Sequence, residues 1–212
     1  TAETAASILP RASWAYDSEA KITEYNPEKS REQLKALGAE NLTLQLWVPT
    51  SSQAWNPSPL KTAELLQADL AQVGVNVVIV PVEGRFQARL MDMNHDLTLS
   101  GWATDSNDPD SFFRPLLSCA AIDSQTNYAH WCNREFDSIL RKALSTQQLA
   151  ARIDAYDEAQ IILAKELPVL PLASSLRLQA YRYDIKGLVL SPFGNASFAG
   201  VSREKQEEVK KP

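Results

Sequence analysis

Three carboxylates, Asp105, Asp108 and Asp110, lie in a polar stretch that begins with Trp102 and follows a short alternating apolar run. This pattern predicts a strand that ends in a loop. Asp108 and Asp110 flank a proline in the order expected at a helix start: an N-cap acid, a proline, and an acid in the first turn. Asp105 has no such role. A carboxylate beside an indole ring suits a ligand's ammonium group, but on local features alone a turn-capping role for Asp105 is the stronger interpretation.

Patterns for other chemistry are weak or missing. The polar residues between 105 and 110 lack the turn glycine and the distal glutamate of a calcium loop. His95 and His130 are isolated, which is typical of structural histidines. The chain has no glycine-rich phosphate loop and no serine nucleophile motif. Asp105 and Asp108 as the acid and base of a small hydrolase remain an alternative. Because no nucleophile or metal accompanies these two acids, the residue types favour binding over catalysis, and we predict no metal site and no cofactor.

The composition is that of an ordinary globular protein. The chain has 212 residues, of which 44% are hydrophobic and 22% charged, and its net charge is -5. No basic stripe is visible, so a nucleic-acid partner is not expected. No apolar run approaches the roughly 18 residues of a membrane helix, so the protein is not expected to be embedded in a membrane. The first residues also lack the order of a signal peptide, and we expect a chain that is mature, processed or cut from a longer one.

Two cysteines, Cys119 and Cys132, are separated by thirteen positions around a polar segment. A disulfide between them would stabilise the fold by about 3 kcal/mol through loop entropy and would indicate an oxidising compartment. Two unrelated buried thiols are equally compatible with the spacing. A zinc site is not expected, because neither a second close cysteine nor suitably spaced histidines accompany them.

The elements that must position these groups alternate between helix and strand. Asn26-Pro27-Glu28 starts a helix that Gly38 ends, and residues 42–48 alternate as a half-buried strand. A polar loop, a helix over 58–73 and a β-branched strand over 75–80 follow. A strand, helix and strand with short connections predict a parallel pair, whose carboxyl edge faces ligand. The loops 50–57 and 102–110 are both expected at such an edge.

The rest of the chain continues this pattern less regularly. It predicts a short helix over 84–93, a strand over 96–100, helices over 136–143 and 149–163, and strands over 167–172 and 176–183. We therefore expect three segments. Residues 1–25, which show neither helical nor strand periodicity, form a connecting or hinge segment, residues 26–175 form an α/β lobe, and residues 176–212 form a returning segment and tail.

Several rare residues keep an order and spacing that resemble the C-terminal part of the periplasmic dipeptide and oligopeptide-binding proteins, the receptors of bacterial peptide ABC importers (extracellular solute-binding proteins, family 5). Within that family the chain is most similar to receptors associated with sensitivity to antimicrobial peptides. The residues that carry the resemblance are Trp14-Ala15-Tyr16, Tyr25-Asn26-Pro27-Glu28-Lys29, Asn56-Pro57, Ala63 to Leu70, Val73-Gly74-Val75, His95-Asp96, Gly101-Trp102 with Asp105, Phe112-Phe113, Ser118-Cys119, Asn127-Tyr128 and Trp131-Cys132.

The resemblance implies the C-terminal lobe of a type II periplasmic-binding-protein clamshell, an α/β fold with a mixed sheet and flanking helices. Family members are more than twice this long, so the N-terminal lobe is missing from the match. By this resemblance Asp105 receives the peptide's ammonium group, Trp102 lines the cleft, and Cys119 and Cys132 form a disulfide. Gln53 replaces an arginine with which dipeptide binders hold the peptide carboxylate, which puts strict dipeptide selection in doubt. The full set of ligand-binding candidates is Asp105, Trp102, Gly101, Thr104, Gln53, Trp55 and Asn56.

The implied function is non-catalytic binding of peptides, antimicrobial peptides among them, in a cleft between two lobes. The expected partners are the peptide, the inner-membrane permease subunits and the missing N-terminal lobe, and the expected location is the periplasm. A receptor for haem or a polyamine is an alternative, since Asp105, Asp108 and Trp102 would suit a polyamine as well as a peptide amine, whereas a haem site usually needs a His, Cys, Met or Tyr ligand.

Overall fold

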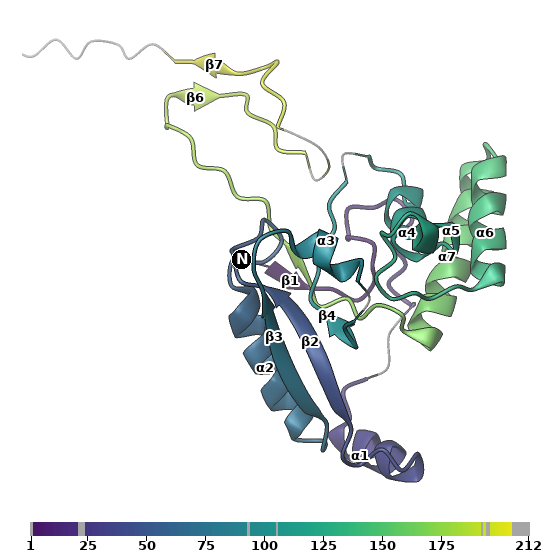
Figure 1. The fold of residues 1–212 in the computed structure, drawn as a ribbon. Helices are drawn as coiled ribbons and strands as arrows, with labels where there is room; N and C mark the ends of the chain where they lie inside the picture. The colour runs from purple at the N-terminus through teal and green to yellow at the C-terminus, as the bar shows by residue number, and fades with distance from the viewer. Residues whose placement is uncertain are drawn as a thin grey trace, which may run out of the picture.

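The computed structural model describes residues 2–20, 24–92, 94–104, 106–191, 193 and 196–204. Figure 1 shows a parallel sheet on one side, a group of helices on the other, and a final hairpin that lies away from both. Among the described residues, no helix is long and apolar enough to cross a membrane. In that same part of the chain, no three His, Cys, Asp or Glu side chains lie together as metal ligands.

The sheet has three parallel strands in the order β3-β2-β4: β2 (Thr43–Pro49), β3 (Asn76–Val82) and β4 (Leu97–Thr98). Helix α2 (Pro59–Ala71) connects β2 to β3 and packs on the sheet. The predicted strand-helix-strand unit is therefore confirmed. The core between them consists of buried aliphatic side chains, because both strands are covered by the helix on that face: Leu46, Val48, Ala63, Val75, Val77 and Leu99.

Helix α1 (Pro27–Ala36) precedes the sheet and is confirmed with its predicted cap, since the Asn26 side chain accepts a hydrogen bond from the Lys29 amide at 2.9 Å. Gly74 ends the connection from α2 to β3 with φ of +90°. A Cβ atom at this position would lie 3.0 Å from the Glu40 carbonyl oxygen. Glycine therefore serves both the left-handed conformation and the close approach.

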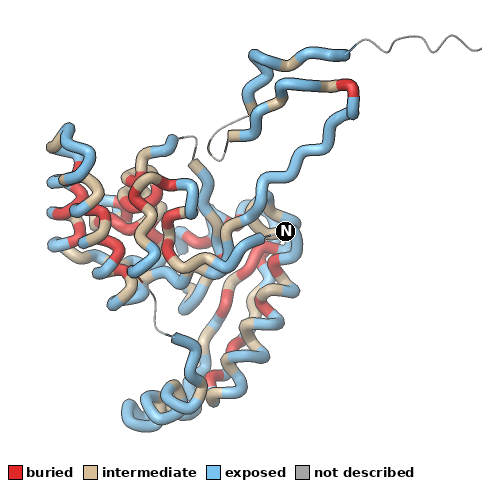
Figure 2. The backbone as a smooth tube through the Cα atoms, turned by 180° about the vertical axis from the view of Figure 1, so that it is seen from behind, coloured by how far each residue is buried: buried red, intermediate tan, exposed pale blue. Residues whose placement is uncertain are grey.

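The helical side contains α3 (Phe86–Leu90), α4 (Asp110–Leu117), α5 (Ala120–Asp123), α6 (Arg134–Ser145) and α7 (Leu149–Glu166). The helices predicted over 136–143 and 149–163 are confirmed as parts of α6 and α7. Phe113, Phe136 and Tyr156 form the aromatic centre of their core. Figure 2 shows buried residues along the facing sides of these helices. Leu9 and Ala15 also belong to this core, so the N-terminal segment packs against the helices.

The strands predicted over 167–172 and 176–183 are wrong, and one further strand was not predicted. The N-terminal segment contains a strand, β1 (Ala2–Thr4), which pairs antiparallel with β5 (Ala173–Ser175). Neither 167–172 nor 176–183 is a strand; β5 lies between them. Leu167 ends α7 in the left-handed conformation with φ of 48°, and the prolines at 168 and 171 have no amide hydrogen to donate to a neighbouring strand.

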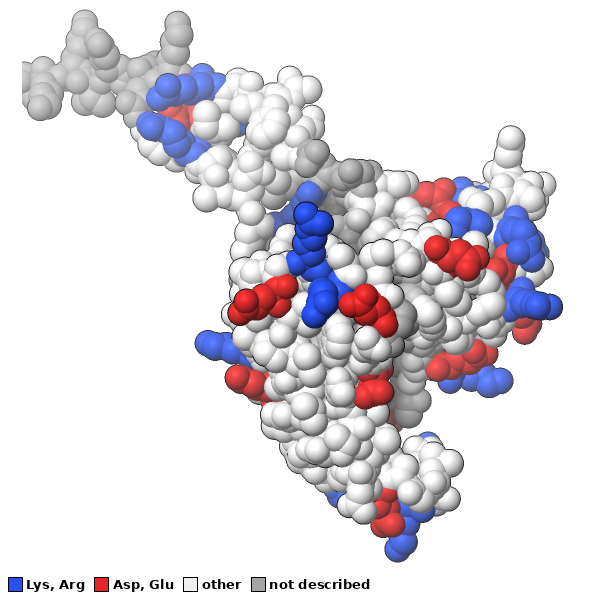
Figure 3. All heavy atoms as spheres, in the orientation of Figure 1, with Lys and Arg blue, Asp and Glu red and all other residues white. Residues whose placement is uncertain are grey.

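The final hairpin consists of β6 (Ile185–Lys186) and β7 (Ser202–Arg203). Asp184 is its buried polar centre and accepts hydrogen bonds from Arg203 at 2.7 Å and Arg182 at 3.2 Å. These bonds, above all the one from Arg203, lower the pKa of Asp184. Figure 3 shows Lys or Arg atoms next to Asp or Glu atoms on the hairpin, and the bond from Arg203 joins β7 to the residue before β6.

Candidate ligand-binding site

The carboxyl edge of the sheet brings the two predicted loops together. The last residue of β2, Pro49, is in register with Val82 at the end of β3, and the Thr50 amide donates to the Val82 carbonyl at 3.2 Å. Strand β4 runs parallel to β2 on its other side. The segments that follow β2 and β4 therefore leave the same edge, where ligands bind in open α/β sheets.

Gly101 and Trp55 are the contact between these two loops. A Cβ atom built on Gly101 would overlap the Cβ, Cγ and Cδ2 atoms of Trp55. Only glycine allows the backbone to approach the indole this closely. The pair therefore fixes the distance between the loop after β2 and the loop after β4.

Gln53 and Asn56 close the first loop into a tight turn. The Gln53 amide donates to the Asn56 carbonyl at 2.9 Å, and the Asn56 amide donates back at 3.1 Å. The Asn56 side chain accepts from the Ser58 amide and donates to Thr62 Oγ1, both at 2.9 Å, so it holds the start of α2. The Gln53 side chain donates to Ser51. This turn places Trp55 against Gly101, and the polar side chains of the turn form hydrogen bonds within the loop and with α2.

Trp102 and Thr104 lie in the second loop. Trp102 is 43% exposed, and its Nε1 donates to the Ser111 carbonyl at 2.9 Å, which fixes the ring relative to α4. Thr104 Oγ1 accepts from the Ser106 amide at 3.1 Å, which stabilises a turn. Asp105 lies outside the described residues. The second loop thus offers an oriented, solvent-accessible indole on the N-terminal side of position 105.

Asp108 has a structural role that goes beyond the predicted helix cap. Its carboxylate accepts from the Asp110 amide at 3.0 Å. The helix starts one residue later than predicted, since α4 begins at Asp110 with Pro109 at the N-cap position, so Asp108 lies just before the cap. It also accepts from Arg152 Nη2 at 2.8 and 3.0 Å and from the Tyr156 hydroxyl at 3.3 Å. Burial raises its pKa, but the bonds from Arg152, the Asp110 amide and Tyr156 outweigh this and lower it. No sequence pattern predicts the contact with Arg152 of α7, which is 44 positions away.

Among the described residues of this region, Asp110 and Tyr156 also have hydrogen-bond partners. Asp110 accepts from Arg114 Nε at 2.9 Å and from its Nη2 at 3.0 Å, one helical turn further along α4. Burial raises the pKa of Tyr156 to about 12, so its hydroxyl stays protonated and donates to Asp108. In an acid and base pair of Asp105 and Asp108, the lowered pKa of Asp108 excludes it as the acid. As a base its carboxylate is already occupied, because it accepts hydrogen bonds from Arg152, Tyr156 and the Asp110 amide.

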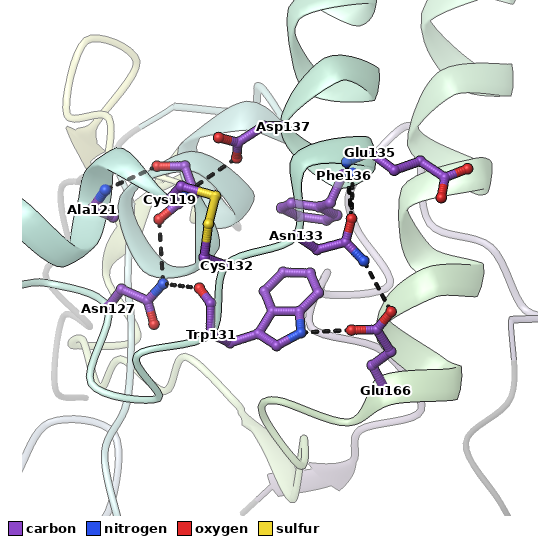
Figure 4. Close-up of a disulfide and its surroundings, with 11 residues drawn as sticks. Cys119, Ala121, Asn127, Trp131, Cys132, Asn133, Glu135, Phe136, Asp137 and Glu166 are labelled. Atoms are coloured by element: carbon purple, nitrogen blue, oxygen red, sulfur yellow. Dashed lines mark hydrogen bonds between the residues drawn. A yellow bond between two sulfur atoms is a disulfide. The ribbon is translucent and has the colours of Figure 1, made fainter.

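A disulfide joins Cys119 and Cys132, as the family resemblance implied, and two unrelated thiols are ruled out. Figure 4 shows it between α4 and α6. The Cys119 amide donates to Asp137 Oδ1 of α6 at 3.2 Å. Glu166 of α7 accepts from Trp131 Nε1 at 2.7 Å and from Asn133 Nδ2 at 2.9 Å. The loop that the disulfide closes is thereby tied to α6 and α7.

Comparisons with known proteins agree with this geometry. Residues 1–124 match the family described as bacterial extracellular solute-binding proteins, family 5 middle domain. The chain is 90% identical over its whole length to the peptide transport periplasmic protein SapA of Salmonella typhimurium, and 89% identical to the probable ABC transporter periplasmic-binding protein SapA of Escherichia coli. In each case it covers 39% of the relative, so the chain spans about two fifths of these proteins.

A solved structure gives the same result for the fold. The dipeptide binding protein from Pseudoalteromonas sp. SM9913, crystallised with Met-Leu, is 41% identical and superposes with a TM-score of 0.84 over 96% of this chain and 40% of its own. The expected α/β lobe of a type II periplasmic-binding-protein clamshell is therefore confirmed.

Proposed function

Because the chain belongs to the family 5 bacterial extracellular solute-binding proteins, we propose that it forms one lobe of a periplasmic peptide receptor for an ABC importer. The observation that carries this proposal is the pair of loops at the carboxyl edge of the sheet, joined by Gly101 and Trp55. An extended peptide would lie across this edge, held by backbone hydrogen bonds and covered by the second lobe. The Salmonella relative is named a peptide transport periplasmic protein, which supports the ligand class, and both relatives are named as periplasmic, which supports the location.

Asp105 is proposed to bind the ammonium group of the peptide's N-terminus. Its neighbour Trp102 supplies an oriented indole whose exposed ring can cover the first residue of the peptide or attract its cation. An ion pair in a cleft that closes over its ligand would contribute on the order of 1 to 4 kcal/mol, depending on how far water is excluded. Thr104 and Gly101 complete this side of the site.

Gln53 is proposed to relax the selection of peptide length. Its side-chain nitrogen donates to Ser51 and carries no charge, so it cannot neutralise the carboxylate at the peptide's C-terminus as an arginine would. Trp55 and Asn56 belong to the same turn, Trp55 as cleft wall and Asn56 as its support on α2. We expect peptides of more than two residues to bind at least as well as dipeptides.

Transfer of the peptide to inner-membrane permease subunits, rather than a chemical step, is proposed as the outcome of binding.

Residues 176–204 are proposed to return to the N-terminal lobe. Several large apolar side chains of this segment are more than half exposed: Leu178, Tyr181, Tyr183, Val189 and Phe198. Such a surface indicates that another part of the protein covers it.

The test is peptide binding to the full-length protein. A set of unmodified peptides of two to five residues, screened by thermal shift, should give ligands whose affinity is then measured by calorimetry. N-acetylation of each ligand and the substitution Asp105→Asn should both weaken binding at least tenfold, because each removes one charge of the same ion pair. Asp123→Asn, a change at an exposed carboxylate of α5, should leave affinity unchanged. Equal affinity for free and acetylated peptides would contradict the role of Asp105.

A further inference from the structure

Arg152 of α7 connects three other parts of the chain through one guanidinium group. Its Nη2 donates to both carboxylate oxygens of Asp108, at 2.8 and 3.0 Å, and to the Tyr156 hydroxyl at 3.0 Å. Its Nε donates to the Ala143 carbonyl of α6 at 3.1 Å. The guanidinium also lies over the Trp14 ring, 5.0 Å from the ring centroid, at the distance of a cation–π contact. The side chain is therefore held on several sides and serves as a fixed support for the second loop.

The second loop contains three consecutive turns that lead to this support. Side-chain oxygens at alternate positions accept from the backbone amide two residues further on: Thr104 from Ser106 at 3.1 Å, Ser106 from Asp108 at 3.0 Å, and Asp108 from Asp110 at 3.0 Å. Bonds of this kind fix the local backbone. Thr104 and Ser106, which form the first turn, flank Asp105 in the sequence. A support at Asp108 therefore acts on the backbone on both sides of position 105.

The contacts of Asp108 tie this loop to α7. Other side-chain bonds of the loop are local, since Trp102 donates to a carbonyl in the first turn of α4 and Asp110 pairs within α4. Among the described residues between 102 and 110, the side-chain hydrogen bonds to α7 all involve Asp108. Loss of its ion pair with Arg152 would therefore loosen the loop from α7, while the local bond of Trp102 would stay in place.

We propose that Arg152 is a positioning residue of the peptide site: through its ion pair with Asp108 it holds the second loop where Asp105 meets the ligand's ammonium group. This inference rests on the proposed role of Asp105. Arg152 acts through the loop, by setting the fraction of molecules in which the loop is in the binding position. The apparent affinity of a ligand is reduced by the fraction of molecules that are competent to bind it. Arg152 therefore determines how strongly the receptor selects a free N-terminus over a blocked one.

The experiment compares two ligands on the full-length protein by calorimetry. The probes are the unmodified peptide of two to five residues that binds the wild type most tightly, and the N-acetylated form of the same peptide. The ratio of their dissociation constants reports the contribution of Asp105, because the acetylated peptide has no ammonium group. A variant that only destabilises the fold weakens both ligands equally and leaves this ratio unchanged.

The test variant combines Arg152→Gln with Asp108→Asn. It removes both charges of the ion pair, keeps the net charge, and retains a side chain that can accept from the Asp110 amide. We expect the preference for the free peptide to fall about fivefold, as for a loop that is in the binding position in about one fifth of the molecules. The affinity for the acetylated peptide should stay unchanged, which also shows that the variant is folded.

Arg114→Gln with Asp110→Asn is the matched control. It removes an ion pair of similar length, 2.9 Å, with the same change of charge, but this pair lies within α4. The preference for the free peptide should stay at the wild-type value. An equal loss in this control, or a wild-type preference that survives in the Arg152 variant, would overturn the inference and leave the role of Asp105 standing. Equal affinity of the wild type for both peptides would refute the role of Asp105 and the inference with it.

Discussion

Replacing Asp108 tests the contact network that holds the second loop against α7. Asp108→Ala removes the bond to the Asp110 amide and the ion pair with Arg152. Loss of a helix-capping side chain costs about 1 kcal/mol. The Asp108 and Arg152 side chains are 38% and 20% exposed, so solvent limits the ion pair to about 1 kcal/mol. We expect Asp108→Ala to lower the free energy of unfolding by about 2 kcal/mol in total.

Asp108→Asn separates the two contributions, because asparagine still caps a helix but carries no charge. It should cost about 1 kcal/mol, half the effect of the alanine variant. Urea unfolding of the chain, followed by circular dichroism, measures both values, and an unchanged slope against urea shows that the unfolded state is comparable.

Glu158→Gln is the matched control. Glu158 of α7 pairs with Lys142 of α6 on the surface, with side chains that are 51% and 59% exposed, and its loss should cost less than about 0.5 kcal/mol. If Asp108→Ala is no more destabilising than this control, the reasoning about Asp108 fails. Additivity of Asp108→Asn and Arg152→Gln in a double-mutant cycle would refute it as well.

Three further predictions concern the same region. The wild type should have a higher free energy of unfolding than Asp108→Asn, and this difference is fully present above the ordinary carboxyl pKa of 3.8, because folding lowers the pKa of Asp108. The difference should shrink as pH falls below 3.8, which urea unfolding at about pH 7 and about pH 3 can check. Gly101→Ala should destabilise the fold by about 1 to 3 kcal/mol, since its Cβ would overlap Trp55, and Trp55→Gly in the same chain, which removes every overlapping atom, should relieve most of this in unfolding measurements. Cys119→Ser with Cys132→Ser should cost about 3 kcal/mol, and reductant should then have no further effect on the unfolding midpoint.

Local signals in the sequence were sufficient for most of the α/β architecture. The cap at Asn26, the strand-helix-strand unit and the helices around Phe136 and Tyr156 depend on neighbouring residues or on hydrophobic periodicity. Because parallel strands end at one edge, the meeting of the two loops could also be predicted. The disulfide required the family resemblance, since spacing alone left two free thiols open.

Contacts between residues that are far apart in the chain could not be predicted from the sequence. The partner of Asp108 is on a helix 44 positions later, and nothing near either residue indicates the contact. Strand β1 has three residues, all exposed, and pairs with a strand about 170 positions away, so it has no amphipathic pattern to detect. Residues 176–183 alternate as a strand would, but alternation predicts a half-buried surface and not the partner that would bury it.

Native mass spectrometry of the purified full-length protein tests the central claim, that this lobe belongs to a peptide receptor anchored at Asp105. The wild type should carry a spread of short peptides with free N-termini, identified after denaturation, and Asp105→Asn should carry far less. A wild-type protein that carries a single non-peptide ligand such as haem or a polyamine, or peptides retained equally by Asp105→Asn, would contradict the claim.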